Sequence, residues 1–99
     1  MRRFLRIAML FLVVDSVALL SYASGHPVPD ETTAVRVAEK VLIPIYGRKH
    51  IESERPFTAK LNGNVWTVYG YLPPGWDGGV AEVEIDKRNG RILRVTHGK

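Results

Sequence analysis

The apolar side chains of this sequence change their spacing once, near residue 57, and this change limits the fold more than any other feature. Between residues 32 and 43 they recur every three to four positions, as on one side of a helix lying on a core. From residue 57 they alternate with polar side chains, as in strands with one buried face. The sequence therefore predicts an α+β domain: one N-terminal amphipathic helix packed on a four-stranded antiparallel sheet.

The predicted helix has signals at both ends. Asp30 is placed to cap its N-terminus. Its apolar stripe consists of Ala34, Val37, Ala38, Val41 and Leu42. Pro44 is expected to end or kink the helix near Ile43, and Gly47 offers a later stop. The polar residues 48–56 are expected to form a connecting loop, with room for a short helical turn.

Four runs of alternating residues follow the loop. They are predicted as strands over residues 57–62, 65–72, 80–86 and 91–97. They are separated by hairpin-turn residues at 62–64 and 87–90 and by a proline- and glycine-rich loop at 73–79. In the last strand, strict alternation puts Ile92 and Arg94 on one face and Leu93 and His97 on the other.

The first 23 residues have the pattern of a secretory signal peptide. A basic start is followed by an apolar centre at residues 7–14 and by small residues near Ala23. The apolar run is shorter than the roughly 18 residues of a stable membrane span, and Asp15 interrupts it. We expect cleavage after Ala23, or alternatively after Gly25. The expected order is a signal peptide at 1–23, a linker at 24–30 and a domain at 31–99.

This order predicts a periplasmic or secreted protein without a stable membrane anchor after cleavage. The alternative is an uncleaved anchor in the inner membrane, because Asp15 weakens the signal. Three of the 14 basic and one of the 10 acidic side chains lie in residues 1–23, which leaves a net charge of +2. Such a mild charge does not indicate nucleic acid as a partner. The sequence contains no cysteine, which excludes disulfides and thiolate chemistry.

The histidines are the first candidates for catalysis or metal binding. His26 lies in the proline-rich linker, His50 in the polar loop and His97 near the end of the chain. We find no metal-binding or catalytic motif around them and expect three surface histidines. The sequence thus predicts no catalytic residue, no metal, no cofactor and no enzymatic activity. A small enzyme built on His50 and His97 is an alternative, since distant segments can meet in the fold.

Five residues are candidates for a protein-binding surface: Tyr69, Tyr71, Trp76, Glu82 and Glu84. Trp76 either is an exposed anchor at the tip of its loop or folds back as a lid on the core. The two tyrosines form an aromatic patch on the open face of the sheet or pack across neighbouring strands. The two glutamates face a basic partner, or they form a solvated strip neutralised by Arg94.

Several segments resemble the bacterial immunity proteins with a nuclear-transport-factor-2-like fold. The matching segments are LIPIYG at 42–47, ERPF at 54–57, W-x-V-x-G-x-LP from Trp66, GGVAEVEI at 78–85 and HGK at 97–99. The resemblance implies a non-enzymatic protein that binds and blocks a cognate toxin of a polymorphic toxin system. It also implies a minimal version of that cystatin-like fold, since the chain is too short for the usual number of helices.

The end of the chain is also similar to small exported domains of the peptidase-propeptide type. That similarity implies a protease inhibitor or a sensory module of the cell envelope. Both resemblances imply a binding protein, and neither supplies contact residues or an oligomeric state.

Overall fold

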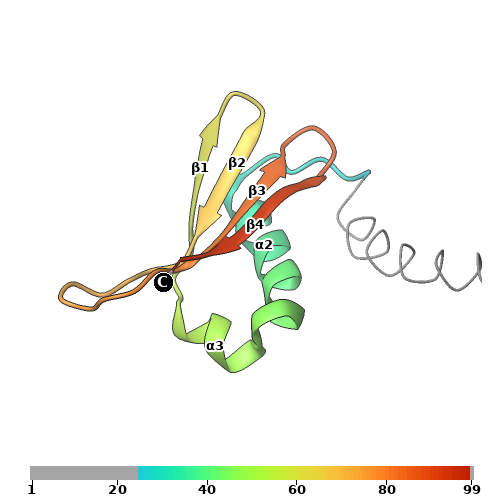
Figure 1. The fold of residues 1–99 in the computed structure, drawn as a ribbon. Helices are drawn as coiled ribbons and strands as arrows, with labels where there is room; N and C mark the ends of the chain where they lie inside the picture. The colour runs from blue at the N-terminus through green and yellow to red at the C-terminus, as the bar shows by residue number, and fades with distance from the viewer. Residues whose placement is uncertain (1–24, 99) are drawn as a thin grey trace, which may run out of the picture.

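The computed structural model describes residues 25–98 (Figure 1). Helix α2 spans Glu31–Tyr46 and is followed by a short helix, α3, at Arg48–Ser53. The strands are β1 (Thr58–Asn62), β2 (Val65–Tyr69), β3 (Ala81–Asp86) and β4 (Ile92–His97). They form one antiparallel sheet in the order β1-β2-β3-β4, with the helices on one face. The predicted α+β architecture is confirmed.

The predicted signal peptide lies outside the described residues, and its boundaries stay predictions. Within residues 25–98, no helix combines the length and the apolar character needed to cross a membrane.

Helix α2 begins where its capping residue predicts. The side chain of Asp30 accepts a hydrogen bond of 2.8 Å from the backbone N–H of Thr33. The buried residues of α2 are Ala34, Ala38, Val41 and Leu42. Of the two expected ends, the one near Ile43 is wrong and the one at Gly47 is confirmed, because the helix continues through Pro44 to Tyr46. Pro44 stands in the last turn. Because proline has no backbone N–H, the helix loses one hydrogen bond there.

The segment before α2 packs against the domain. The backbone N–H of Val28 donates to the carbonyl of Lys87 at 2.8 Å, and the Val28 side chain is almost fully buried. The indole N–H of Trp66 donates to the carbonyl of Val28 at 2.7 Å. Part of the predicted linker is therefore fixed to the sheet through β2 and the β3–β4 turn.

The core lies between α2 and the inner face of the sheet. Alternate strand residues fill it: Ala59, Trp66, Val68, Ala81, Val83 and Ile85. Strand β2 is shorter than predicted, because it ends at Tyr69, and Leu72 is exposed. The connection between β2 and β3 extends away from the sheet as a narrow arm (Figure 1).

Strand β4 contains an irregularity that the alternation does not show. Ile92 pairs with Ile85, but Arg94 pairs with Glu84, so the register shifts between Glu84 and Ile85. Leu93 is the extra residue of this bulge. The predicted facing of β4 is therefore wrong: Ile92 is buried on the helix side, whereas Arg94 faces the opposite side.

Candidate functional site

Two residues of the α3 region stand one helical turn apart and direct their side chains to the same place. Residues 48–53 form a helix because the fully buried Ile51 anchors one side of it to the core. On a helix, residues four apart are neighbours, and this places His50 beside Glu54. The prediction of a plain connecting loop is wrong here, whereas the short helical turn that it left room for is present.

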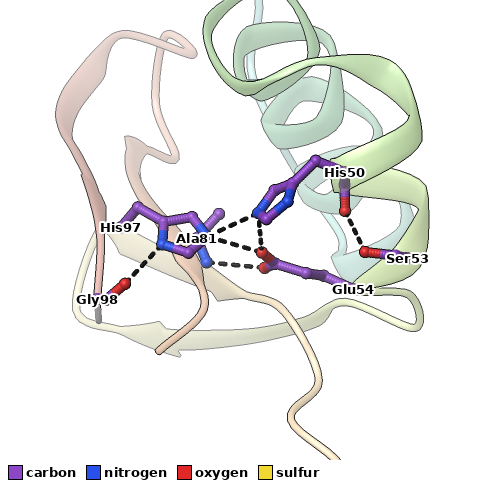
Figure 2. A network of polar contacts seen from close by, with 6 residues as sticks. All are labelled: His50, Ser53, Glu54, Ala81, His97 and Gly98. Atoms are coloured by element: carbon purple, nitrogen blue, oxygen red, sulfur yellow. Dashed lines mark hydrogen bonds and ion pairs between the residues drawn. The ribbon is translucent and has the colours of Figure 1, made fainter. Parts of the chain in front are cut away.

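Strand β4 brings a third residue to this pair. His97 is opposite Ala81 in the sheet, and Ala81 is on the buried face. His97 therefore points to the side of the sheet that carries the helices. The structure unites His50, Glu54 and His97 where α3 meets the C-terminal end of β4 (Figure 2).

The polar atoms of the three side chains form a close triangle. Oε2 of Glu54 lies 2.9 Å from Nε2 of His50 and 2.8 Å from Nε2 of His97. The two Nε2 atoms are 3.0 Å apart. Only 9% of the Glu54 side chain is exposed, against 21% for His97 and 50% for His50. The triangle therefore has a buried carboxylate at its base and an imidazole at the solvent side.

The carboxylate of Glu54 is held by the backbone of the sheet. Its Oε1 accepts a hydrogen bond of 2.8 Å from the backbone N–H of Ala81. A buried carboxylate needs such partners, because moving its charge out of water without hydrogen bonds costs free energy. Separately, the backbone carbonyl of Glu54 accepts one of 2.8 Å from the backbone N–H of Tyr71. Gly70 provides the room: a Cβ atom there would come within 2.9 Å of Cβ of Glu54.

His97 is oriented by its own backbone neighbour. Its Nδ1 lies 2.7 Å from the carbonyl oxygen of Gly98, an acceptor only, so we assign the proton to Nδ1. Burial lowers the pKa of His97, but the hydrogen bonds with Gly98 and Glu54 outweigh burial and leave that pKa raised. The ring of Tyr46 lies 5.1 Å away, centroid to centroid, and Tyr46, His50 and His97 line a shallow hollow of about 300 Å³.

In chemical terms, two imidazole nitrogens and one carboxylate oxygen form a donor set found in metal sites. The sequence signal was available: a histidine and a glutamate four residues apart. In the predicted loop this spacing carries no geometric meaning, whereas in a helix it brings both side chains together. The contribution of His97 has no local signal, since it depends on the fold.

The five predicted interface residues fall into two groups. Tyr71 and Trp76 lie on the arm between β2 and β3, where they are 47% and 69% exposed. Trp76 does not fold back as a lid on the core. Tyr69, Glu82 and Glu84 are half-buried on the outer face of the sheet, and Tyr69 is directly opposite Glu82.

The two glutamates share one cation. Nη1 of Arg94 lies 3.8 Å from a carboxylate oxygen of Glu82 and 3.8 Å from one of Glu84. Arg94 thus offsets part of the charge of the two carboxylates, in the direction that one of the two interpretations of this strip expects. Pairs as exposed as these contribute little to stability.

By its fold, the protein is of the α+β class, with two helices on one face of a four-stranded antiparallel sheet. Comparison with known protein families identifies it further. The chain belongs to the NTF2-fold immunity protein family, whose sequence model matches residues 33–99. The resemblance seen in the sequence is confirmed.

Two relatives from Escherichia coli strain K12 match over most of the chain. It is 34% identical over 87 residues to "uncharacterized protein YbbC", covering 87% of this chain and 71% of that protein. It is 33% identical over 79 residues to "uncharacterized protein YhhH", covering 79% of this chain and 62% of that protein. No solved structure matches the chain significantly.

Proposed function

We propose that this immunity-family protein is exported, binds a cognate bacterial toxin and blocks it by occlusion, without catalysis. The observation that carries the proposal is the exposure of Trp76 and Tyr71 on the arm between β2 and β3. A tryptophan so exposed is an unfavourable choice for a surface in contact only with water. Tryptophan and tyrosine are enriched among the residues that dominate binding energy.

The outer face of the sheet supports the same proposal. Within residues 25–98, the helices pack on the other face, and the outer face carries half-buried aromatic and charged side chains. Glu82, Glu84 and Arg94 are partly exposed and paired only at 3.8 Å, so they are available to charges on another protein. Charges of this kind tune the specificity and the rate of association more than the affinity.

The test is a capture experiment in the producing cell. The full-length chain, with an epitope tag after Lys99, is recovered with its bound proteins, and mass spectrometry identifies them. A variant with Tyr71→Ala and Trp76→Ala is recovered in parallel. Leu61→Ala is the matched control, because Leu61 is also an exposed apolar residue but lies on β1. A toxin domain captured by the wild type and by Leu61→Ala, and lost from the double variant, supports the proposal.

Co-expression gives the functional readout. The captured toxin, produced alone, is expected to stop growth, and the wild-type chain is expected to restore it. Capture of a protease with no toxin would instead favour an inhibitor of the peptidase-propeptide type. Equal capture by the double variant would remove the arm from the binding surface.

Export is tested on the N-terminus of the chain itself. Intact-mass measurement on protein from the periplasm is expected to find a chain that begins at Ser24, or at His26 for the alternative cleavage. An intact chain in the membrane fraction would establish the uncleaved anchor. An intact chain in the cytoplasm would contradict export.

A further inference from the structure

The triangle of His50, Glu54 and His97 cannot be satisfied by protons alone. A ring nitrogen carries either a proton or a lone pair, never both. If both Nε2 atoms carry protons, each donates to Glu54, and two N–H groups then face each other across 3.0 Å. If only one Nε2 carries a proton, the other Nε2 has a lone pair facing the carboxylate oxygen, which also has lone pairs and no proton to donate. No arrangement gives all three edges a hydrogen bond of their own.

A cation satisfies all three atoms at once, because each directs one lone pair to it. With metal–ligand bonds of about 2.0–2.1 Å, ligand atoms as close as these subtend angles of about 90° at the ion. Opening each edge to about 3.3 Å gives tetrahedral angles, a movement of only a few tenths of an ångström. The imidazole centroids are 5.1 Å apart. Two imidazoles that share one tetrahedral ion have centroids about 5 Å apart.

The surroundings of the triangle are those of an oriented ligand set. Metal-binding histidines commonly donate their other ring N–H to a backbone carbonyl, and Nδ1 of His97 does so to Gly98. Ligating carboxylates are in turn hydrogen-bonded, and Oε1 of Glu54 accepts from Ala81 while Oε2 points into the triangle. Two of the three ligands are therefore held in place by hydrogen bonds with backbone groups, His97 by its neighbour Gly98 and Glu54 by the distant Ala81.

We propose that Nε2 of His50, Nε2 of His97 and Oε2 of Glu54 form a binding site for one divalent transition-metal ion, with Zn²⁺ the best match. Imidazole ligands favour zinc, copper, nickel and iron over magnesium and calcium. Three protein ligands leave a fourth position, which opens to the shallow hollow beside Tyr46. The ion joins the α3 region to the C-terminal end of β4.

The test is calorimetric titration with ZnCl₂ of the untagged protein from the producing cell, after bound metal has been removed by dialysis against a chelator. We expect one ion per chain with an affinity in the micromolar range or tighter. His50→Ala is expected to weaken binding by at least the roughly 10–100-fold that loss of an outer partner of a metal ligand costs. His26→Ala is the matched control, because His26 is an exposed histidine outside the triangle, and its affinity is expected to equal that of the wild type.

Two further measurements separate a metal site from a purely structural network. Glu54→Gln keeps an oxygen to accept from Ala81 but offers a poorer ligand, so it is expected to fold and to lose the zinc-dependent rise in Tm. Co²⁺ bound to the wild type is expected to show visible d–d absorption that is absent in His97→Ala. Absence of saturable zinc binding by the wild type, or unchanged binding by a His50→Ala, His97→Ala double variant, would overturn the proposal.

Discussion

Gly70 lies directly against the side chain of Glu54: a Cβ atom at position 70 would come within 2.9 Å of Cβ of Glu54 and closer still to its Oε1. The buried carboxylate and the residue that makes room for it lie on different elements. Gly70 also donates a backbone hydrogen bond of 3.0 Å to Ala81, so it extends the sheet at the point where Glu54 docks. Replacing it affects the site and the sheet together.

Gly70→Ala is expected to lower the free energy of unfolding by about 1–3 kcal/mol, the usual cost of forcing extra volume into a packed site. Urea denaturation measures this cost. In a Glu54→Gly background the added methyl group meets neither the carboxylate nor Cβ of residue 54, and we expect it to cost clearly less. An equal cost in both backgrounds would show that the backbone of Gly70, and not its contact with Glu54, sets the effect.

Trp66→Phe is expected to destabilise the domain, because it leaves the buried carbonyl of Val28 without its donor. The expected loss is about 1–3 kcal/mol, the cost of an unsatisfied buried polar group. Hydrogen exchange at the Val28 amide is expected to become faster, since the segment before α2 loses one of its attachments. Trp76→Phe, on the exposed arm, is the control and is expected to change stability by less than about 0.5 kcal/mol.

The hydrogen bonds from Arg88 lower the pKa of Asp86 from its usual 3.8 to about 2. Because the pKa is lower in the folded state, this carboxylate adds stability above about pH 4, and the gain is lost as pH falls through 2. In Asp86→Asn, the free energy of unfolding is expected to fall less steeply between about pH 4 and pH 2 than in the wild type. Denaturation at a series of pH values measures this. In Arg88→Gln, the loss of stability with falling pH is expected to begin at a higher pH, because the pKa of Asp86 is lowered less. An unchanged pH dependence would contradict the role of Arg88.

Tyr71→Ala with Trp76→Ala is expected to leave stability within about 0.5 kcal/mol of the wild type, because Trp76 is largely exposed and Tyr71 about half exposed. If they anchor the toxin, binding weakens by more than about 2 kcal/mol, or roughly 30-fold. Denaturation and a binding isotherm on the same preparations measure the two effects. A loss of stability comparable to the loss of binding would mean that the arm supports the fold itself.

Local patterns were sufficient to predict most of the fold. Alternation identified all four strands, and Asp30 marked the start of α2, because both depend on neighbours in the sequence. The errors have two sources. Helix α2 continues through the exposed Pro44 as far as the stop at Gly47, and residues 48–53 become helical around the buried Ile51. Burial in the folded core overrides local preference in the second case.

The candidate site could be predicted only in part. The loop that carries Trp76 was predicted from its proline and glycine residues, but the sequence left open whether Trp76 is exposed, and it placed Tyr71 in a strand that in fact ends at Tyr69. The triangle does not, because the partners of Glu54 are 27 and 43 residues away, at Ala81 and His97. Residues 48–53 had to be helical, and the bulge in β4 had to be present, before these side chains could meet.

That bulge decides on which face His97 lies. Without the extra residue at Leu93, strict alternation from the buried Ile92 would turn His97 to the outer face, away from His50 and Glu54. A deletion of one codon could therefore abolish the triangle while leaving all three of its residues in the gene. Among relatives, agreement at these three positions is thus insufficient to infer the cluster. The number of residues between the β3–β4 turn and the final histidine is the better guide.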